Sequence, residues 1–479
     1  MSRFFASSSL RVGLASVGFV SAFGAASLLA QSPASSSADA SSPPHALARA
    51  IYRELVEIDT TARNGAAQAA VAMAARLKAA GFADTELTLA GPQPQSQNLV
   101  VRLRGRGSRR PVLFIGHLDV VEALRADWTT DPFTLVEKDG YFYGRGTTDM
   151  KDGIAALVTS LIRLKQAGYV PERDIIVALT DHEEGGGTNG VSWLLQDRRD
   201  LIDAEYCINP DGGGGELKHG KPVVLEFQTA EKTYLAIQLE VTNKGGHGSL
   251  PVKDNAIYRL AAGLGRLAAY DFPIQLNETT RTFFARSAAQ ETGPTKADML
   301  AVAQTPPDLA AAARLAASSA LYNAMLRTTC VATMLSGGHA ENALPQVARA
   351  TLNARMLPDG SVDDVLATLK TVLADDQIRI TRRGSGGVSP LSPLRPDVFE
   401  KVERLTAATW PGVTVTPTMS TGATDGKHLR EAGIPVYGVS GSFTDVDDAR
   451  AHGKDERLGV KEFYAAVDFM HELMKTVAQ

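Results

Sequence analysis

The fold is decided by the stretch Asp174-Ile175-Ile176-Val177-Ala178-Leu179-Thr180-Asp181-His182-Glu183-Glu184-Gly185-Gly186-Gly187. Its first half, through Thr180, is an apolar and β-branched run that predicts a buried strand. The strand delivers two adjacent carboxylates, Glu183 and Glu184, onto a glycine-rich turn. Because adjacent carboxylates at a strand end cannot both point the same way, one can bind a cation while the other moves protons. For an isolated pair, an acidic solvated turn is the better interpretation.

Three other predicted strands favour the metal interpretation, because they also end in residue types that bind metals. The run Pro111 to Gly116 leads into His117 and Asp119, the run Ala204 to Asn209 leads into Asp211, and the run Ile434 to Val439 leads into the loop that carries His452. Taken singly, such residues have structural alternatives, for example a hydrogen-bonded histidine or a helix N-cap aspartate. Loops beyond the carboxyl ends of strands form the ligand crevice of an open α/β sheet, so we expect these residues to meet. The full set is His117, Asp149, Glu183, Glu184, Asp211 and His452.

Size and composition are those of an ordinary globular protein. The chain has 479 residues, of which 44% are hydrophobic and 21% are charged, so it can bury a large core and hold two or more domains. A formal net charge of -4 gives no electrostatic reason to expect nucleic acid or an anionic membrane as a partner. Two cysteines, Cys207 and Cys330, are too few for a disulfide framework.

The N-terminus has the pattern of an export signal. Arg3 and Arg11 precede an apolar run of small residues that ends near residue 30, and a Ser/Ala/Pro-rich tract follows. We predict a signal peptide over residues 1–30 and a flexible linker over 31–44, hence a periplasmic or secreted protein without stable membrane insertion after signal removal. An uncleaved N-terminal membrane anchor is the alternative, because the apolar run is somewhat long for a signal.

The pattern of buried strands and helices is interrupted once. The pattern covers residues 45–231 and returns over residues 385–479. The segment between them, residues 232–384, begins differently, because apolar and polar residues alternate from Tyr234 to Val241. We therefore predict an α/β catalytic domain with a mixed, mostly parallel sheet, split by an inserted α+β domain over 232–384. Within the insertion, Leu309 to Leu326 predict one alanine-rich helix.

The ligand types favour zinc, with cobalt or manganese as alternatives, because imidazole nitrogens and carboxylate oxygens bind first-row metals. The set is too large for one tetrahedral ion. It suits two ions about 3.5–4 Å apart that share a carboxylate and a water.

Together, these motifs resemble one co-catalytic zinc hydrolase family. It includes glutamate carboxypeptidase, carboxypeptidase S, succinyl-diaminopimelate desuccinylase, aminoacylase and carnosinase. The resemblance runs from about His45 to the C-terminus, and no single motif carries it. The motifs, in the family's order, are Gly116-His117-Leu118-Asp119, Gly144-Arg145-Gly146-Thr147-Thr148-Asp149-Met150-Lys151, Glu183-Glu184, Asp211 and His452.

The resemblance implies a role for each of these residues. One zinc would be held by His117, Asp149 and Asp211, and the other by Asp149, Glu184 and His452, with Asp149 as the bridge. The peptide bond after Asp149 is expected to be cis. In addition, Asp119 would orient His117, and Glu183 would be the general base.

The inserted block resembles the family's lid, which forms the dimer contact in many members, so a homodimer through the lid is an expected partner arrangement. By the resemblance, His247 would donate to the oxyanion, from the partner subunit in dimeric members. Asn342 and Arg355 would contact substrate, Arg355 as a clamp for a carboxylate, and Gly422 would line the pocket floor. Without the resemblance, these four are a loop histidine, a strand-end asparagine, a surface arginine and a turn glycine. The segment Arg281 to Pro306 has no clear motif and would be extra lid structure that shapes the pocket.

These observations predict a zinc-dependent exopeptidase of the carboxypeptidase or dipeptidase type, which cleaves small peptides at an amide bond next to a free carboxylate. The nearest alternative is an N-acyl-amino-acid amidohydrolase with the same mechanism. A metal-binding protein without catalysis is a further alternative, but it would not need Glu183 beside its ligands. A serine hydrolase is disfavoured because no G-x-S-x-G motif is present.

Overall fold

The computed structural model describes residues 42–358, 360–384 and 387–479. The export signal predicted for residues 1–30, and most of the linker predicted for 31–44, lie outside the described residues. Among the helices that are described, none is both long and apolar enough to cross a bilayer.

The larger sheet is mixed, and it follows the order β1-β2-β6-β3-β7-β17-β9-β8-β18, with β16 paired to β9. Its centre is parallel, since β3 pairs in parallel with both β6 and β7, and β17 pairs in parallel with β7. Every residue of β6 is buried, which confirms the strand predicted before the Glu183-Glu184 pair. The strands are β1 (Leu87–Gln93), β2 (Ser96–Leu103), β3 (Val112–His117), β6 (Ile175–Thr180), β7 (Tyr206–Asn209), β8 (Gly215–Lys218), β9 (Lys221–Glu231), β16 (Thr414–Ser420), β17 (Val436–Gly438) and β18 (Phe443–Asp445).

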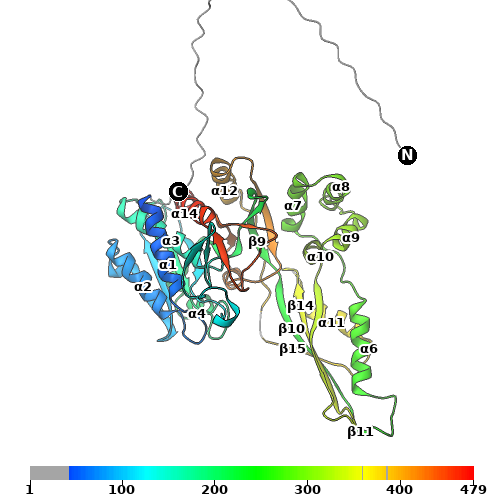
Figure 1. Cartoon of the computed structure of the whole chain (residues 1–479). Coiled ribbons are helices and arrows are strands. Elements are labelled where there is room, and N and C mark those ends of the chain that lie inside the picture. The colour runs from blue at the N-terminus through cyan, green and yellow to red at the C-terminus, as the bar shows by residue number, and fades with distance from the viewer. Residues whose placement is uncertain (1–41, 359, 385–386) are drawn as a thin grey trace, which may run out of the picture. The chain divides into compact units, whose positions relative to one another are not determined.

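Helices pack on this sheet and complete the predicted α/β fold (Figure 1). Helix α3 packs against both α1 and α14, and the rings of Tyr52 and Phe463 stack between the last two helices. Side chains of β3 and β6, such as Leu113 and Ile176, form a core with residues of α4, α5 and α13. The helices are α1 (Pro43–Glu57), α2 (Ala67–Ala79), α3 (Lys151–Gln166), α4 (Gly190–Asp197), α5 (Arg199–Ile202), α12 (Pro396–Thr409), α13 (Gly426–Glu431) and α14 (Val460–Val477).

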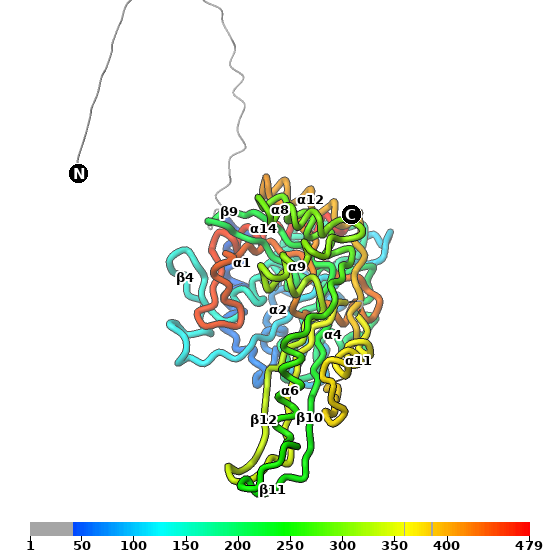
Figure 2. Tube along the Cα trace, turned by 90° about the vertical axis from the view of Figure 1, so that its right-hand side faces the viewer, coloured from blue at the N-terminus to red at the C-terminus, as the bar shows by residue number. Residues whose placement is uncertain are grey.

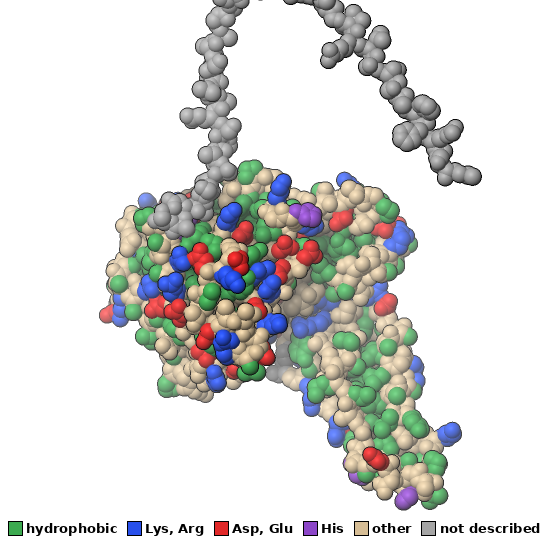
Figure 3. Space-filling model, in the orientation of Figure 1, with side chains coloured by type: hydrophobic (Ala, Val, Ile, Leu, Met, Phe, Trp, Pro, Cys, Tyr) green, Lys and Arg blue, Asp and Glu red, His purple; other side chains and the backbone are tan. Residues whose placement is uncertain are grey.

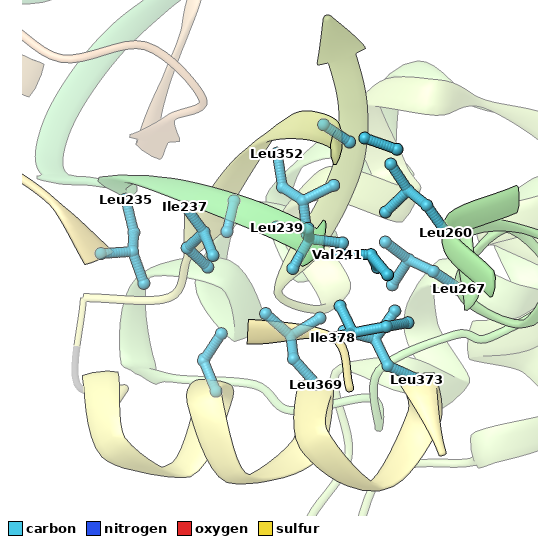
Figure 4. Close-up of a cluster of buried hydrophobic side chains, with 14 of the residues drawn as sticks. Leu235, Ile237, Leu239, Val241, Leu260, Leu267, Leu352, Leu369, Leu373 and Ile378 are labelled. Atoms are coloured by element: carbon cyan, nitrogen blue, oxygen red, sulfur yellow. The ribbon is translucent and has the colours of Figure 1, made fainter. Parts of the chain in front are cut away.

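A second sheet is antiparallel throughout and has the order β12-β14-β10-β15. Strand β10 alternates as predicted, because Leu235, Ile237, Leu239 and Val241 are buried against two helices (Figure 4). The elements are β10 (Thr233–Thr242), β12 (Thr329–Gly337), β14 (Val347–Met356), β15 (Arg379–Arg383), α6 (Ala256–Ala268) and α11 (Val362–Leu373). They fall within the segment 232–384, whose status as a separate domain stays a prediction.

Four helices stand between α6 and β12 in the chain, where the sequence predicts one. They are α7 (Glu278–Ser287), α8 (Gly293–Val302), α9 (Leu309–Ser318) and α10 (Ala320–Leu326). The single helix predicted over Leu309 to Leu326 is wrong: Ser319 has an extended backbone, and its side chain accepts the backbone N–H of Tyr322 as the N-cap of α10. We call α7–α10 the helical insert. It packs against β16 through a shared apolar core that includes Phe284 and Met419.

The remaining elements are short. The strands β4 (Val136–Lys138), β5 (Tyr141–Tyr143) and β19 (Arg457–Gly459) form a small sheet, and β11 (Gly246–His247) pairs with β13 (Ala343–Leu344). In both views, β11 lies at the end of the second sheet that is far from α4 (Figures 1 and 2). Single turns of 3-10 helix cover Asp84–Glu86, Arg125–Asp127, Pro210–Gly212 and Ala288–Gln290.

Candidate metal centre

The predicted ligands converge at the carboxyl ends of the central strands. His117 Nε2 lies 3.1 Å from Asp149 Oδ1 and 3.8 Å from Asp211 Oδ1. His452 Nε2 lies 2.9 Å from Asp149 Oδ2 and 2.8 Å from Glu184 Oε1. The two carboxylate oxygens of Asp149 therefore face two different histidines, and the five side chains form two donor sets that share Asp149.

The topology explains this convergence. His117 ends β3, Glu184 follows β6, and Asp211 follows β7, and these three strands are neighbours that run in the same direction. Their carboxyl ends therefore meet at one edge of the sheet. The loop before α3 adds Asp149, and the loop between β18 and β19 adds His452.

Asp119 contacts both His117 and the turn that carries Glu183 and Glu184, and it uses different atoms for the two contacts. Its backbone oxygen lies 3.0 Å from Nδ1 of His117, while its carboxylate Oδ1 is 3.7 Å from the same nitrogen. The carboxylate instead accepts the backbone N–H groups of Glu183, at 3.2 Å, and Glu184, at 3.0 Å. Asp119 is 1% exposed, so these bonds are shielded from water. It thereby fixes the ring of His117 and the turn that carries both glutamates.

The cluster carries a surplus of negative charge. Hydrogen bonding to Asp149, together with the charge of Glu184, raises the pKa of His452 to about 9. Burial, and the carboxylates of Asp425 and Asp211, raise the pKa of Glu183 to about 9. Burial acts to raise the pKa of Asp149 as well, but hydrogen bonds from His117 and His452 bring it below its ordinary value. Bound cations would offset this negative charge and lower the pKa values of the groups around them.

The donor sets fit metal ions. Two ligands at tetrahedral positions around zinc lie about 3.3 Å apart, given bonds of about 2.0–2.1 Å. The donor atoms of His117, Asp149 and Glu184 all lie within 4.8 Å of one another, and the pairs above lie between 2.8 and 3.8 Å. The peptide bond between Asp149 and Met150 is cis, as the resemblance predicts.

Comparison with known proteins also indicates a metal-dependent hydrolase. The family model described as peptidase family M20/M25/M40 matches residues 113–476, which include every residue of the two donor sets. The chain belongs to this family. It is therefore a metallopeptidase or amidohydrolase, and the predicted family resemblance, fold class and enzyme class are confirmed.

Curated proteins are similar to this M20 enzyme over most of its length. The chain is 30% identical over 381 residues to the N-fatty-acyl-amino acid synthase/hydrolase PM20D1 of Homo sapiens. The matched region covers 77% of this chain and 74% of the relative. The chain is 29% identical over 385 residues to a probable carboxypeptidase S-like protein of Dictyostelium discoideum, covering 77% of this chain and 72% of the relative.

Solved structures share the fold. An M20 family metallo-carboxypeptidase from Sulfolobus solfataricus has a TM-score of 0.66 at 17% identity, covering 90% of this chain and 99% of that one. Human carnosine dipeptidase 1 has a TM-score of 0.60 at 17% identity, covering 90% and 97%.

The predicted substrate residues are not all near the metal centre of this M20 enzyme. His247 and Asn342 are exposed neighbours in the β11–β13 ribbon, where Gly248 donates its N–H to the Asn342 backbone oxygen. That ribbon lies at the far end of the second sheet (Figures 1 and 2). Arg355 is half-buried on β14 and stacks over the ring of Tyr234, 4.9 Å away. Gly422 is exposed in the loop after β16, where its N–H donates to the Ser420 hydroxyl.

One supporting residue, Glu456, was missed from the sequence. Its carboxylate is fully buried and accepts bonds from Arg145 Nη1, at 2.6 Å, and from the backbone N–H groups of Gly146, Thr148 and Asp149. Glu456 thus holds the loop that presents Asp149. Its only signal in the sequence is its position four residues after His452.

Asp425 was missed too. It is buried behind the Glu183 turn, where Oδ1 accepts the side-chain amide of Asn189 at 2.5 Å and Oδ2 accepts the hydroxyl of Thr180 at 3.1 Å. It lies in the segment Thr421-Gly422-Ala423-Thr424-Asp425-Gly426, of which only Gly422 is expected at the site from the sequence.

Proposed function

We propose that this enzyme is an exported, zinc-dependent exopeptidase that hydrolyses the amide bond preceding a free carboxylate, as carboxypeptidases and dipeptidases do. The observation that carries the proposal is the position of Asp149, whose two oxygens lie 3.1 Å from His117 and 2.9 Å from His452. A carboxylate shared in this way suits two ions. Zinc fits the mixture of imidazole and carboxylate donors, and cobalt or manganese are alternatives.

His117, Asp149 and Asp211 would hold one ion, and Asp149, Glu184 and His452 the other. When bound, such ions polarise the scissile carbonyl and lower the pKa of water in the site. Glu183 lies among the donors without belonging to either set, which suits a general base that takes a proton from the attacking water and gives it to the leaving nitrogen. Asp119 keeps Glu183 in place through the backbone bond described above.

Arg355 would bind the substrate carboxylate. Its guanidinium stacks on Tyr234, and none of the described residues forms an ion pair with it. An arginine without an acidic partner, half-buried on a strand, is suited to a bidentate contact with a carboxylate. Asn342 and Gly422 are proposed as further substrate contacts by family resemblance.

A second candidate function is the hydrolysis of N-acyl amino acids. It is supported by the similarity to PM20D1, which is named as an N-fatty-acyl-amino acid synthase/hydrolase. The two reactions share the leaving group, an amino acid with a free carboxylate, and differ in the acyl side.

The test is a substrate panel combined with metal analysis. Purified enzyme should contain about two metal ions per chain, and activity should disappear on chelation and return with zinc. Dipeptides are compared with N-acetyl, N-succinyl and N-fatty-acyl derivatives of the same amino acids. Preference for dipeptides supports the exopeptidase, preference for the acyl derivatives supports the second candidate, and turnover that survives complete metal removal contradicts both.

We also propose that the lid forms a homodimer in which His247 reaches the partner's metal centre. His247 is exposed, and the strand that carries it, β11, lies at the end of the second sheet that is far from α4 (Figure 2). Beside it, α6 and β12 carry exposed apolar side chains, and hydrophobic surface is visible over these elements (Figure 3). The exposed side chains are Ile257, Tyr258, Val331, Met334 and Leu335. Strand β12 is the outermost strand of the second sheet on its side, and an edge strand flanked by apolar surface is suited to pairing with a second copy.

Export is proposed from the N-terminal pattern alone. Expression of the full chain with fractionation, followed by N-terminal sequencing of the exported protein, tests it. A new N-terminus near residue 30 in a soluble fraction supports a cleaved signal, and retention in the membrane with an intact N-terminus supports the anchor.

A further inference from the structure

A pocket of about 350 Å³ opens beside the candidate metal centre. It lies where β9, β16 and the helical insert come together, and Asp211 forms part of its wall. Its lining also includes Glu226, Gln228, Leu321, Thr418 and Met419. Leu321 belongs to α10, so the helical insert contributes directly to a pocket that touches a proposed metal ligand.

Gln228 is the unusual member of this lining. The residue is 1% exposed, and among the described residues neither its amide nitrogen nor its amide oxygen has a hydrogen-bond partner. A buried amide without partners costs free energy, so such groups are normally paired. At Gly212 an added Cβ would come within 2.1 Å of Gln228 Oε1, so glycine leaves the room that this side chain occupies.

The wall formed by α10 is held firmly. The ammonium group of Lys232, between β9 and β10, donates to the backbone oxygens of Ala324 and Arg327, each at 2.8 Å. These carbonyls lie at the C-terminal end of α10, where helix carbonyls lack partners within the helix. Leu321 is 51% exposed, so its side chain is available to a ligand in the pocket. The pocket is therefore built before substrate arrives.

The pocket also lies close to the proposed carboxylate clamp. The ammonium group of Lys232 also lies 3.4 Å from the hydroxyl of Thr329, and Thr329 pairs with Arg355 between β12 and β14, which puts Arg355 near the residue that anchors α10. A substrate whose carboxylate binds Arg355 and whose scissile carbonyl lies at the metal centre would have its C-terminal residue between these points. The side chain of that residue is the group that can enter the pocket.

We propose that this pocket receives the side chain of the substrate's C-terminal amino acid and that Gln228 is a specificity-determining residue, which favours an uncharged hydrogen-bonding side chain of the glutamine type. This inference rests on the proposed function. Gln228 supplies an NH2 group that donates and a carbonyl oxygen that accepts, which match the same two groups of another primary amide. Two carboxyl groups, those of Asp211 and Glu226, also line the pocket and disfavour an acidic side chain of the same size.

The test uses three substrates that differ only in the leaving residue, which is glutamine, glutamate or methionine, and that carry either an N-terminal alanine or an N-acetyl group, whichever the substrate panel shows wild type to cleave. The enzyme is assayed with zinc at pH 8, above the raised pKa of about 7 of Glu226. Wild type should prefer glutamine over glutamate. Gln228→Met keeps the side-chain volume but removes both hydrogen-bonding groups. It should lower kcat/KM for the glutamine substrate by about 10- to 100-fold relative to the methionine substrate.

Further variants act as controls. Leu321→Ala should lower kcat/KM for the glutamine and methionine substrates by a similar factor, because it removes a wall and not a hydrogen bond. Leu300→Ala removes an exposed leucine from α8 of the same insert and should change neither. Glu226→Gln should raise kcat/KM for the glutamate substrate selectively. Metal content per chain and the unfolding temperature are measured for each variant, so that loss of the fold or of the ions is recognised.

The outcomes separate the two proposals. If wild type hydrolyses the substrates but Gln228→Met changes glutamine and methionine equally, the role of Gln228 is overturned and the proposed function stands. If Leu321→Ala behaves like Leu300→Ala, α10 is not a wall of the substrate site. If metal-loaded wild type cleaves none of these substrates and no dipeptide, the proposed function fails and the inference fails with it.

Discussion

Asp119 serves the two halves of the metal centre with two different groups. The peptide oxygen fixes the ring of His117, and the carboxylate fixes the N–H groups of Glu183 and Glu184. A family resemblance assigns Asp119 to His117 alone, but the distances give its side chain to the glutamates. The role of a residue in this site therefore depends on which of its atoms makes each contact.

Glu183→Gln should strongly lower turnover while leaving the ions in place. Glutamine keeps the size and the backbone bond to Asp119, but it cannot take a proton, so we expect kcat to fall by about 10²–10⁴-fold. Metal content is measured by atomic spectroscopy on the same sample, and Glu184→Gln, which changes a proposed ligand, is the comparison. Unchanged kcat with full metal content would contradict the assignment of Glu183 as the base.

Glu456→Gln should destabilise the protein strongly. Glu456 and Arg145 are 0% and 3% exposed, and removing one charge of a buried pair leaves the other uncompensated. We expect a loss of about 3–5 kcal/mol in the free energy of unfolding. Urea denaturation measures it. Glu403→Gln breaks a partly exposed pair with Arg286 and should cost at most about 1 kcal/mol; equal losses in the two variants would refute the argument.

At the scale of elements, the β8–β9 hairpin brings two acidic side chains onto adjacent strands. Glu226 is half-buried on β9, and Glu216 lies on β8. Burial, and then the charge of Glu216, raises the pKa of Glu226 to about 7. The folded state therefore holds a proton that the unfolded chain gives up at a lower pH. The contribution of the neutral Glu226 carboxyl to the free energy of unfolding is fully present below about pH 4.3, the pKa of glutamate in the unfolded chain. It declines as the pH rises through about 7, the pKa of Glu226 in the folded protein.

Glu226→Gln should remove this decline. The variant's unfolding temperature should exceed that of wild type more at pH 8 than at pH 5, since only wild type ionises a buried group over this range. Calorimetry of both proteins at the two pH values measures the difference. Glu216→Gln should produce a smaller change of the same sign. An offset that is independent of pH would contradict the shift.

The helical insert is the element whose sequence was least informative. Leu309 to Leu326 look like one alanine-rich helix, because alanine favours helix throughout and Ser319 is only a weak interruption. In the fold, Ser319 caps α10, and the change of direction brings Leu321 to the pocket wall. Residues of α9 and α10 share an apolar core with Met419 of β16, and local propensity does not reveal such packing.

At the scale of the whole molecule, the proposed dimer predicts complementation between inactive variants. His247→Ala and Glu183→Gln should each be inactive alone. When the two are unfolded together and refolded as a mixture, a heterodimer would have one site with an intact Glu183 and a partner's intact His247. Random pairing should then restore about a quarter of wild-type activity.

Light scattering of the same mixture measures the oligomeric state. A mixture of Glu183→Gln with Glu184→Gln is the control, because both changes lie in the same site and each heterodimer site stays defective. A dimer that recovers no activity in the first mixture would contradict the supply of His247 by the partner, and a monomeric protein would contradict the dimer itself.

The sequence by itself determined the family, the fold class and the identities of the candidate ligands, because these depend on residue types at strand ends and on their order along the chain. His117, Asp149, Glu184, Asp211 and His452 could be named without coordinates, since a parallel arrangement of strands brings their carboxyl ends to one edge.

Only the tertiary structure decided which atoms support those ligands and what surrounds them. Glu456 gave no signal beyond its position four residues after His452, and Gln228 gave none. A lone Glu or Gln in a sequence does not show whether it is buried, paired or without a partner. Hydrogen bonding and burial depend on contacts between segments hundreds of residues apart, and those contacts exist only once the chain has packed.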